Sequence, residues 1–440
     1  MPGDLTPSIY LCVEESFREL ESRILIAGLA VEVGLDVVLG QQWLLAENAP
    51  HLPRGLYLFK GNNKVQHEFM AYVRRHGHLV ASIEEEALGV ARADQIMRLY
   101  DRGVEETCDL FFAQGPFHRD TLAAHRSGAS GKIEVVGNPR LDFLRPEFLA
   151  RIESECVRLR AEHGPFILFN TNCSGINSNI GDALGAYESS IRTRFFAADN
   201  RADDDLFRML CEWERGNIRA MLRLIKRIAE TPAWPAVIVR PHPSERPGIW
   251  TEALADVPRV QVVHSAGHLP WTLASEILVH TGCTTGMEAV VAGHNAISLT
   301  IEASSWHDCF VSNHINPTFT TLNDAAVFLS DELSGRKPMA AQRARLRPAL
   351  ERHIAATEGS MASERIVAAM RKLLPRERIT AWQHGSNLKR QRAERLREQA
   401  KMKVTPDEVS MHLSTMAATL RRFQSLHVEE IGPSLFRVRR

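Results

Sequence analysis

AVIVRPHP (residues 236–243) and ILVHTGCTTGMEA (277–289) each begin as a short apolar run and end in polar residues. Runs of Val, Ile and Leu bounded by Pro or Gly are typical of buried strands. The second stretch leads into a helix that we expect over residues 286–292. Because ligands bind outside the carboxyl ends of the strands in an open α/β sheet, we expect both polar clusters at one binding edge.

The two clusters carry groups that bind phosphate. Prolines on both sides of His242 restrict the backbone around the imidazole, and Arg240 adds a guanidinium. A helix start also attracts anions through its N–H groups. Simpler interpretations are a loop histidine after a proline-terminated strand and a single threonine that caps the helix. One threonine is enough for a cap, so we predict a phosphate site made of Arg240, His242, Pro243, Thr284, Thr285 and Gly286.

Three more residues are assigned to the nucleotide side of this site. Glu288 lies one helical turn further on, where its carboxylate can accept ribose hydroxyls, although a solvated surface glutamate is the alternative. Asn170 and Asn172 follow the strand FILFN (166–170), and such a loop contacts phosphate through amides. These side chains extend the predicted site to a second strand end.

Short apolar runs alternate with helical patterns along most of the chain, which predicts an α/β fold with two doubly wound, Rossmann-like domains. Ser16 is expected to cap the first helix, with Glu19 completing a capping box. We place the domains at 1–150 and 151–375, the second sheet being complete by about residue 300, and a basic helical tail at 376–440. The expected strands are 8–13, 36–39, 56–59, 78–82, 110–113, 132–136, 166–170, 237–239, 277–279 and 295–299, and the longer helices are 17–33, 146–163, 203–230, 322–333 and 340–374.

The composition is that of a soluble globular protein. The 440 residues have a net formal charge of zero, so no overall charge points to nucleic acid. Seven dispersed cysteines without a C-x-x-C pair favour a reducing compartment. Neither a signal peptide nor an apolar stretch of about 20 residues is evident, and we therefore expect a cytoplasmic protein.

The first domain has its own polar strand ends. Glu84, Glu85 and Glu86 follow the strand HLVAS (78–82), and mutual repulsion tends to raise the pKa of at least one of them. They can serve as a general base or nucleophile, or simply as acids at a helix start. We assign Glu15, Glu19, Arg23 and Lys60 to the acceptor side of the site, although long polar side chains near strand ends are usually only solvated.

The run Lys389–Lys403 is strongly basic. A solvated helical face or a partly ordered tail explains it most simply. The alternative is an electrostatic contact with anionic lipid head groups or with an assembly enzyme at the inner membrane.

Seven segments together carry a resemblance to a known family. In order along the chain they resemble the bacterial surface carbohydrate biosynthesis protein family, and any single one would be weak. That family resembles GT-B glycosyltransferases, in which two Rossmann-like domains face a cleft and the C-terminal domain holds the donor nucleotide. The segments are EESFRELESRILIAGLAVEVGLDVVLG (14–40), PRGLYLFK (53–60), GHLVASIEEEAL (77–88), VVGNPRLDFLRP (135–146), ILFNTN (167–172), VIVRPHPSE (237–245) and VHTGCTTGMEAVVAGHNAIS (279–298).

The His-Pro pair and the Thr pair are also similar to motifs of bacterial sialyltransferases, Kdo transferases and CDP-glycerol glycerophosphotransferases. The resemblance implies that His242, Pro243, Thr284 and Thr285 hold the phosphate of a cytidine nucleotide. Asn138, in the GNPR turn, is assigned to the donor side as well. The family's acidic motif is expected to read Asp-Glu-Glu-Gly, whereas this chain has Glu84-Glu85-Glu86-Ala87.

The function that the resemblance implies is a glycosyltransferase of capsule or lipopolysaccharide biosynthesis. Its donor would be a CMP-sugar such as CMP-Kdo or a sialic-like sugar, and its acceptor a glycan or glycolipid. Neither a metal nor another cofactor is expected, because Asp203–Asp205 open a helix rather than form a D-x-D loop. The alternatives are a CDP-glycerol-type polyol-phosphate transferase, a UDP-sugar GT-B enzyme or epimerase, and a non-catalytic assembly subunit.

Overall fold

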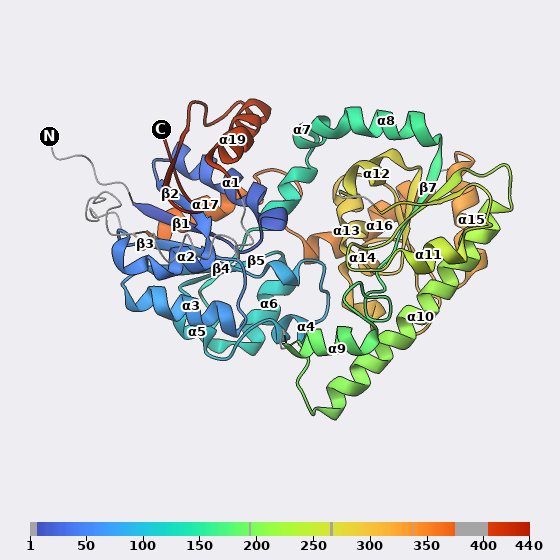
Figure 1. Cartoon of the computed structure of the whole chain (residues 1–440), viewed down its shortest axis with the longest axis horizontal. Coiled ribbons are helices and arrows are strands. Elements are labelled where there is room, and N and C mark those ends of the chain that lie inside the picture. Colours follow the sequence, from blue (N-terminus) through green and yellow to red (C-terminus); the bar gives the residue numbers. More distant parts are fainter. Residues whose placement is uncertain (1–6, 193–194, 265–266, 337, 375–403) are drawn as a thin grey trace. The chain divides into compact units, whose positions relative to one another are not determined.

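The computed structural model describes residues 7–192, 195–264, 267–336, 338–374 and 404–440 (Figure 1). These residues divide into two compact units, each built around one parallel sheet. The first unit spans residues 1–88, 96–143 and 353–440, and the second spans 89–95 and 144–352, both with the gaps just given. The α/β fold with two Rossmann-like domains is therefore confirmed.

The first unit holds an eight-stranded sheet in the order β13-β14-β2-β1-β3-β4-β5-β6 among its described residues. Strands β1 to β6 run parallel, and β14 pairs antiparallel with β2. Its strands are β1 Ser8–Val13, β2 Asp36–Gln41, β3 Gly55–Phe59, β4 Leu79–Ile83, β5 Leu110–Ala113, β6 Ile133–Val135, β13 His427–Gly432 and β14 Leu435–Arg439, and its helices are α1 Ser16–Glu32, α2 Gln42–Glu47, α3 Lys64–Arg75, α5 Val104–Thr107, α6 Pro116–His125, α17 Ala362–Leu373 and α19 Pro406–Leu420.

The second unit holds a six-stranded sheet, β12-β11-β10-β7-β8-β9, whose described strands all run parallel. Helix α4, Ala93–Arg98, lies where the chain passes between the two units. The strands are β7 Phe166–Asn170, β8 Ala236–Arg240, β9 Val260–Val262, β10 Ile277–His280, β11 Ala296–Leu299 and β12 Thr318–Phe319, and the helices are α7 Pro146–Leu149, α8 Glu153–His163, α9 Ala183–Arg192, α10 Arg201–Ala229, α11 Gly248–Ala253, α12 Leu269–Ala274, α13 Thr284–Val291, α14 Val311–Ile315, α15 Leu322–Leu333 and α16 Pro338–His353.

The strands of the second sheet are apolar on both faces because helices cover both. Ile167 and Phe169 in β7 belong to the core that includes α10 and α15. The alternate residues Phe166 and Leu168 belong to the core that includes α8 and α12. Successive strand residues point to opposite faces, so a continuous apolar run is what a doubly covered sheet requires.

Several predicted boundaries are wrong for local reasons. Glu15, not Ser16, occupies the N-cap position of helix α1 and makes no side-chain capping bond, and Glu19 accepts a hydrogen bond from the Glu14 amide at 2.8 Å. The predicted helix 146–163 is interrupted by a 3-10 turn between α7 and α8, and the predicted helix 340–374 is two helices, α16 and α17. The second sheet also continues past residue 300, because β12 pairs with β11.

The predicted domain division is wrong at the C-terminus, where a basic helical tail was expected from residue 376. The chain returns to the first unit at residue 353, and α17 and α19 pack on α1 (Figure 1). Strand β14 then extends the first sheet beyond β2, with Leu435, Phe436 and Val438 buried. These strands cover what would otherwise be an exposed sheet edge. The predicted basic run 389–403 lies outside the described residues.

Phe436→Ala should therefore destabilise the first unit. The ring is fully buried in β14, and its removal leaves a cavity that costs about 3–5 kcal/mol of unfolding free energy. Denaturant unfolding measures the loss. Arg439→Ala, on the same strand but exposed, is the control and should change stability by less than about 0.5 kcal/mol. Equal stability of Phe436→Ala and the wild type would show that β14 does not belong to the cooperative core.

Candidate functional site

The order of strands in the second sheet predicts where its ligand binds. β7, the first strand of this sheet along the chain, lies between β8 and β10, so the chain reverses its direction of winding between β7 and β10. In open α/β sheets the ligand crevice opens at this reversal, at the carboxyl ends of the strands. Asn170 ends β7, and its Nδ2 donates to Oγ1 of Thr285, just beyond β10, at 3.1 Å. The structure thus brings together two residues predicted separately.

Helix α13 begins at this point. It starts at Thr284, two residues earlier than predicted, and Cys283 occupies the N-cap position. Thr284 is exposed and Thr285 is partly buried, so both hydroxyls lie in the first turn of the helix. An anion placed there meets the N-terminal N–H groups and the positive end of the helix dipole.

No role is predicted from the sequence for His280, which ends β10 and packs against Gly286 in the first turn of α13. It is fully buried at the end of β10, and burial lowers its pKa to about 3, so the ring is neutral. A Cβ atom at position 286 would lie 2.2 Å from His280 Nε2, which explains why Gly286 is glycine. Gly286 therefore acts through close packing, and Asn316 Nδ2 donates to the same imidazole nitrogen at 3.3 Å.

Arg240 and His242 lie at the end of the neighbouring strand β8. Arg240 is only 7% exposed, its guanidinium is 5.7 Å from the centre of the Trp271 ring, and burial lowers its pKa to about 10. It therefore stays charged at neutral pH. The Ser244 amide donates to Nδ1 of the exposed His242 ring at 3.1 Å, so Nδ1 acts as an acceptor and the ring N–H is assigned to Nε2.

Glu245 is the second residue that the sequence reasoning missed, although it follows RPHPS directly. Its buried carboxylate accepts hydrogen bonds from both loops of the site and from the helix that follows. Because the loops after β7 and β8 share this acceptor, their positions are coupled. The donors are Thr171 Oγ1 at 2.6 Å, the Cys173 amide at 2.9 Å, Asn177 Nδ2 at 3.2 Å, the His242 amide at 3.4 Å and Trp250 Nε1 at 3.1 Å.

The remaining predicted donor residues have defined partners. Asn172 Nδ2 donates to the Gly282 carbonyl at 2.8 Å and so ties the loop after β7 to the loop after β10. Glu288 is 7% exposed and lies 2.5 Å from Nε2 of His268. The alternative of a solvated surface glutamate is therefore wrong.

The first sheet has its own reversal, between β1 and β3. Lys60 follows β3, and its Nζ lies 2.9 Å from Glu14 Oε2 and 3.5 Å from Glu19 Oε1. Burial opposes the charge of this ammonium, but Glu19 and Glu14 outweigh it and raise the pKa of Lys60. Burial raises the pKa of Glu19 despite Lys60 and Arg23. Lys60 and Glu19 thus lie within ion-pair distance of each other at a strand end, whereas the nearby Glu15 occupies the N-cap position of α1.

The three adjacent glutamates have three different environments. Glu84 is buried, accepts from the Asn62 amide at 2.7 Å and from Asn62 Nδ2 at 3.2 Å, and burial raises its pKa to about 8. Glu85 is buried against the fully buried Arg23, with Oε1 to Nη1 at 3.4 Å. Glu86 is exposed and pairs with Arg18 at 3.0 Å. Only Glu86 combines a carboxylate with direct access to solvent.

The assignment of Asn138 to the donor side stays a prediction, although this residue is not part of the second unit. It belongs to the first unit, and its Nδ2 donates to Oε2 of Glu85 at 3.1 Å. The bend at GNPR places the amide beside Glu85, which follows the carboxyl end of β4. With Arg23, it fixes the orientation of the Glu85 carboxylate.

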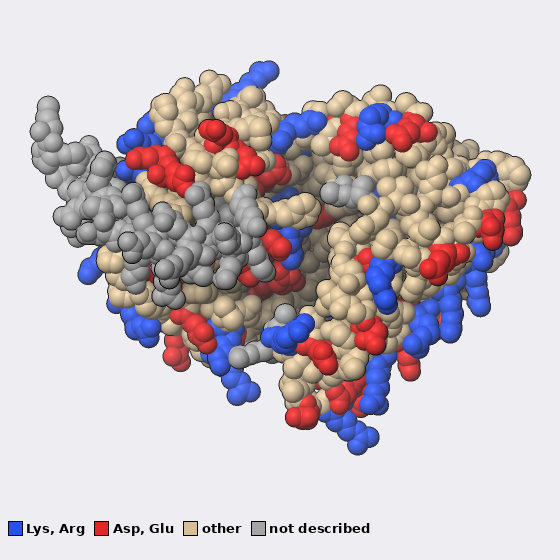
Figure 2. Space-filling model, in the orientation of Figure 1, with Lys and Arg blue, Asp and Glu red and all other residues tan. Residues whose placement is uncertain are grey.

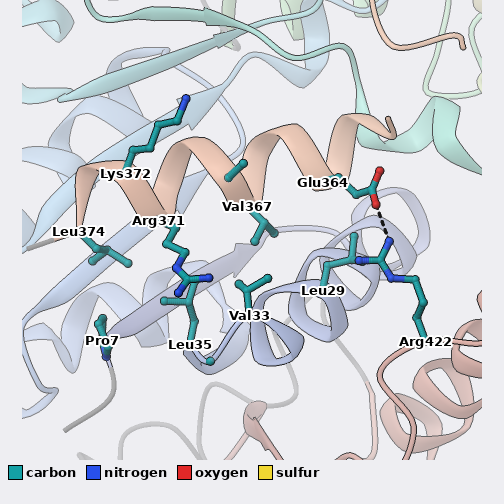
Figure 3. A pocket seen from close by; sticks show the side chains of 12 residues that line it. Pro7, Leu29, Val33, Leu35, Glu364, Val367, Arg371, Lys372, Leu374 and Arg422 are labelled. Atoms are coloured by element: carbon teal, nitrogen blue, oxygen red, sulfur yellow. Dashed lines mark hydrogen bonds and ion pairs between the residues drawn. The ribbon is translucent and has the colours of Figure 1, made fainter. Parts of the chain in front are cut away.

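A cavity of ≈ 820 Å³ lies elsewhere in the first unit (Figure 3). Val33 and Leu35 face Val367 and Arg371 of α17 across it, and Glu364 pairs with Arg422 at one end. Pro7 and Leu35, which also line it, precede β1 and β2, so the cavity lies at the amino ends of the strands. It is therefore separate from the polar strand ends described above.

Within the described ranges, no group of three or more His, Cys, Asp or Glu side chains is placed to hold a metal ion. Among the helices that the structure describes, none has both the length and the apolar character needed to cross a bilayer.

Comparisons with known proteins bear on the fold. No family model and no curated protein matches the sequence. A proposed UDP-N-acetylglucosamine 2-epimerase from Listeria monocytogenes aligns with a TM-score of 0.54 at 11% identity, covering 84% of this chain and 96% of that chain. Another UDP-N-acetylglucosamine 2-epimerase aligns with a TM-score of 0.50 at 13% identity, covering 92% of this chain and 99% of that one. At these identities the likeness shows a shared GT-B-like fold.

Gly286→Ala should disrupt the start of α13. The added methyl would lie 2.2 Å from a buried imidazole, so the helix start or His280 must move, and we expect a lower melting temperature and weaker anion binding. Thermal unfolding with and without inorganic phosphate measures both. Gly248→Ala is the control, since the nearest atom to its Cβ is 3.8 Å away in a flexible side chain. A Gly286→Ala variant as stable as this control would contradict the packing argument.

Glu84 should make stability depend on pH. Its pKa is about 8 in the folded protein against 4.5 for an ordinary glutamate side chain, so the folded state binds the extra proton. This contribution is complete below pH 4.5 and is lost as the pH rises through 8. The Glu84→Gln side chain cannot ionise. The melting temperature of this variant relative to that of the wild type should therefore be higher above pH 8 than at pH 5. Melting temperatures across this range test it, and a difference that does not change with pH would refute the assignment.

Proposed function

We propose that the protein is an enzyme acting on a nucleotide-activated sugar, with the nucleotide phosphate bound at the carboxyl edge of the second unit's sheet. The observation that carries the proposal is the hydrogen bond between Asn170 and Thr285 across the β7/β10 reversal. Around it lie a buried guanidinium, an imidazole N–H and the first turn of α13. These are donors and positive charges that match a phosphate ester.

The same groups suit the departure of a nucleotide from a sugar. When the bond between the anomeric carbon and the phosphate oxygen breaks, the electron pair leaves with the phosphate. Arg240, which stays charged at neutral pH, and the N–H groups of α13 stabilise the negative charge that develops there. This role is common to glycosyl transfer and to epimerisation that passes through nucleotide release.

We propose a UDP-sugar as the substrate. Two structures that share the fold are described as UDP-N-acetylglucosamine 2-epimerases, and this supports uridine diphosphate before cytidine monophosphate. The second candidate is the CMP-sugar transferase of surface polysaccharide assembly. It is favoured by one observation, the presence of the His242-Pro243 pair after β8 and the Thr284-Thr285 pair after β10, the two strands that flank β7.

In the first unit, Glu86 is the best candidate for an acid or base toward the acceptor or sugar. It is exposed, whereas Glu84 and Glu85 are buried and engaged in hydrogen bonds or an ion pair. Lys60, 3.7 Å from Glu86 Oε1, keeps this carboxylate next to a positive charge. Replacing Glu85 would leave Arg23 as a buried cation without its carboxylate. In this proposal Glu85 therefore holds Arg23 in place and does not react itself.

Calorimetric titration with UDP, UDP-N-acetylglucosamine and CMP, without and with magnesium, tests the function. We expect UDP to bind, Arg240→Gln to weaken it about 10–100-fold, and Thr285→Val about tenfold, because each removes a donor to phosphate. Thr251→Val, exposed on α11, is the matched control and should bind as the wild type does.

Each other result has a meaning. Tighter binding of CMP than of UDP would replace the first candidate by the second. Equal affinity in the wild type and both site variants would place the nucleotide elsewhere. If none of the three ligands binds, the enzyme proposal is rejected and an assembly subunit is favoured.

A further inference from the structure

Helix α10 presents a line of positive charge to solvent. Its apolar positions, such as Leu224 and Ile228, belong to the core of the second unit. Its exposed positions in the C-terminal half recur every three or four residues, which places them on one side of the helix. This basic stripe consists of Arg215, Arg219, Arg223, Lys226 and Arg227. Figure 2 shows Lys and Arg side chains projecting in a row along the edge formed by α10.

The stripe is not neutralised by neighbouring acids. Among the described residues, none of its five members lies within 4 Å of a carboxylate, and Arg227 Nη2 donates a hydrogen bond to Asn323 Oδ1 at 3.4 Å. Of the nearby acids, Glu214 is buried and bonded to the Gly175 amide, and the exposed Glu212 and Glu230 flank the two ends of the stripe. Some exposed arginines elsewhere are paired, as Arg158 is with Glu162 at 2.9 Å.

The charge is therefore concentrated in one place in a chain whose net charge is zero. Five cations on consecutive turns repel one another, and the helix keeps them there because its opposite face is held in the core. From Arg215 to Arg227 the stripe is about 18 Å long, at about 1.5 Å of rise per residue. A row of exposed cations along one side of a helix suits a flat anionic surface.

We propose that the basic stripe of α10 docks the second unit on a membrane surface containing anionic phospholipids. Each cation meets a separate lipid phosphate, and no insertion follows, because the apolar face of α10 is buried. A protein partner fits less well, since protein interfaces have an apolar centre and this stripe exposes no large apolar side chain. A single-stranded nucleic acid would need aromatic side chains for base stacking, and the stripe contains none.

Vesicle co-sedimentation of the full chain tests the proposal. The probes are vesicles of phosphatidylcholine alone and of equal parts phosphatidylcholine and phosphatidylglycerol. We expect binding to the anionic vesicles only, and a loss of binding as salt rises from about 0.05 M to about 0.5 M. The triple variant Arg215→Glu, Arg219→Glu, Arg223→Glu should reduce the bound fraction at least about tenfold. Each basic residue near such a surface raises the affinity about fivefold, and the variant removes three of them.

The control variant changes the charge by the same amount elsewhere in the second unit: Arg158→Glu, Arg160→Glu, Arg345→Glu, all at exposed positions. It should keep binding close to that of the wild type. Circular dichroism and UDP titration check that both triple variants are folded, and UDP binding should be unchanged because the stripe lies outside the candidate site. The basic run 389–403 is present in every variant and so cannot account for a difference between them.

Three results would overturn the proposal. Equal binding of anionic vesicles by the stripe variant and the control variant refutes it, because the stripe variant should bind more weakly. Binding of the wild type to neutral vesicles as strong as to anionic ones refutes it as well. A stripe-dependent retention on single-stranded DNA, without stripe-dependent vesicle binding, would identify a nucleic-acid surface instead.

Discussion

The buried carboxylate of Glu245 is the interaction on which the candidate site depends. It accepts hydrogen bonds from the loop after β7 through Thr171 and Cys173, and from the loop after β8 through the His242 amide. A carboxylate removed from water is stable only when its oxygens are satisfied, so the two loops must keep the arrangement that supplies these donors. That arrangement holds Asn170, Arg240 and His242 at neighbouring strand ends. The buried His280 has the same role beneath α13, where only glycine at position 286 leaves it room.

The two units present different chemistry at equivalent places in their sheets. At the reversal of the second sheet, the groups are hydrogen-bond donors and a guanidinium, together with a helix start, which suits phosphate. At the reversal of the first sheet, Lys60 lies among carboxylates, with Glu14, Glu19 and Glu86 within 4 Å. Carboxylates accept hydrogen bonds from hydroxyls and can take a proton, which suits a sugar or an acceptor alcohol. This division of chemistry is the physical basis for assigning nucleotide binding to the second unit.

Much of this arrangement could be predicted from the sequence, because it depends on local patterns. Apolar runs that end in Pro, Gly or Thr located β7, β8 and β10, and α15 matched at both ends. Contacts between residues distant in the sequence could not be predicted, such as Asn138 with Glu85 or Glu245 with Thr171. The C-terminal strands were not predicted, because the basic run before them indicated a helical tail over the whole segment. The alternation of apolar and polar residues in SLFRVR (434–439), directly after Pro433, indicates a strand. Only the pairing with β2 shows which sheet this strand joins.

Hydrogen–deuterium exchange of the backbone amides, with and without saturating UDP, tests the central claim most directly. The account predicts slower exchange in the start of α13, residues 283–287, and in the loop 240–245, because the nucleotide phosphate is bound by donors in these segments. CMP, if it is the better ligand, should protect the same segments, since the phosphate site is shared. Protection confined to the first unit, or protection that leaves α13 and the loop after β8 unchanged while UDP is bound, would contradict the account.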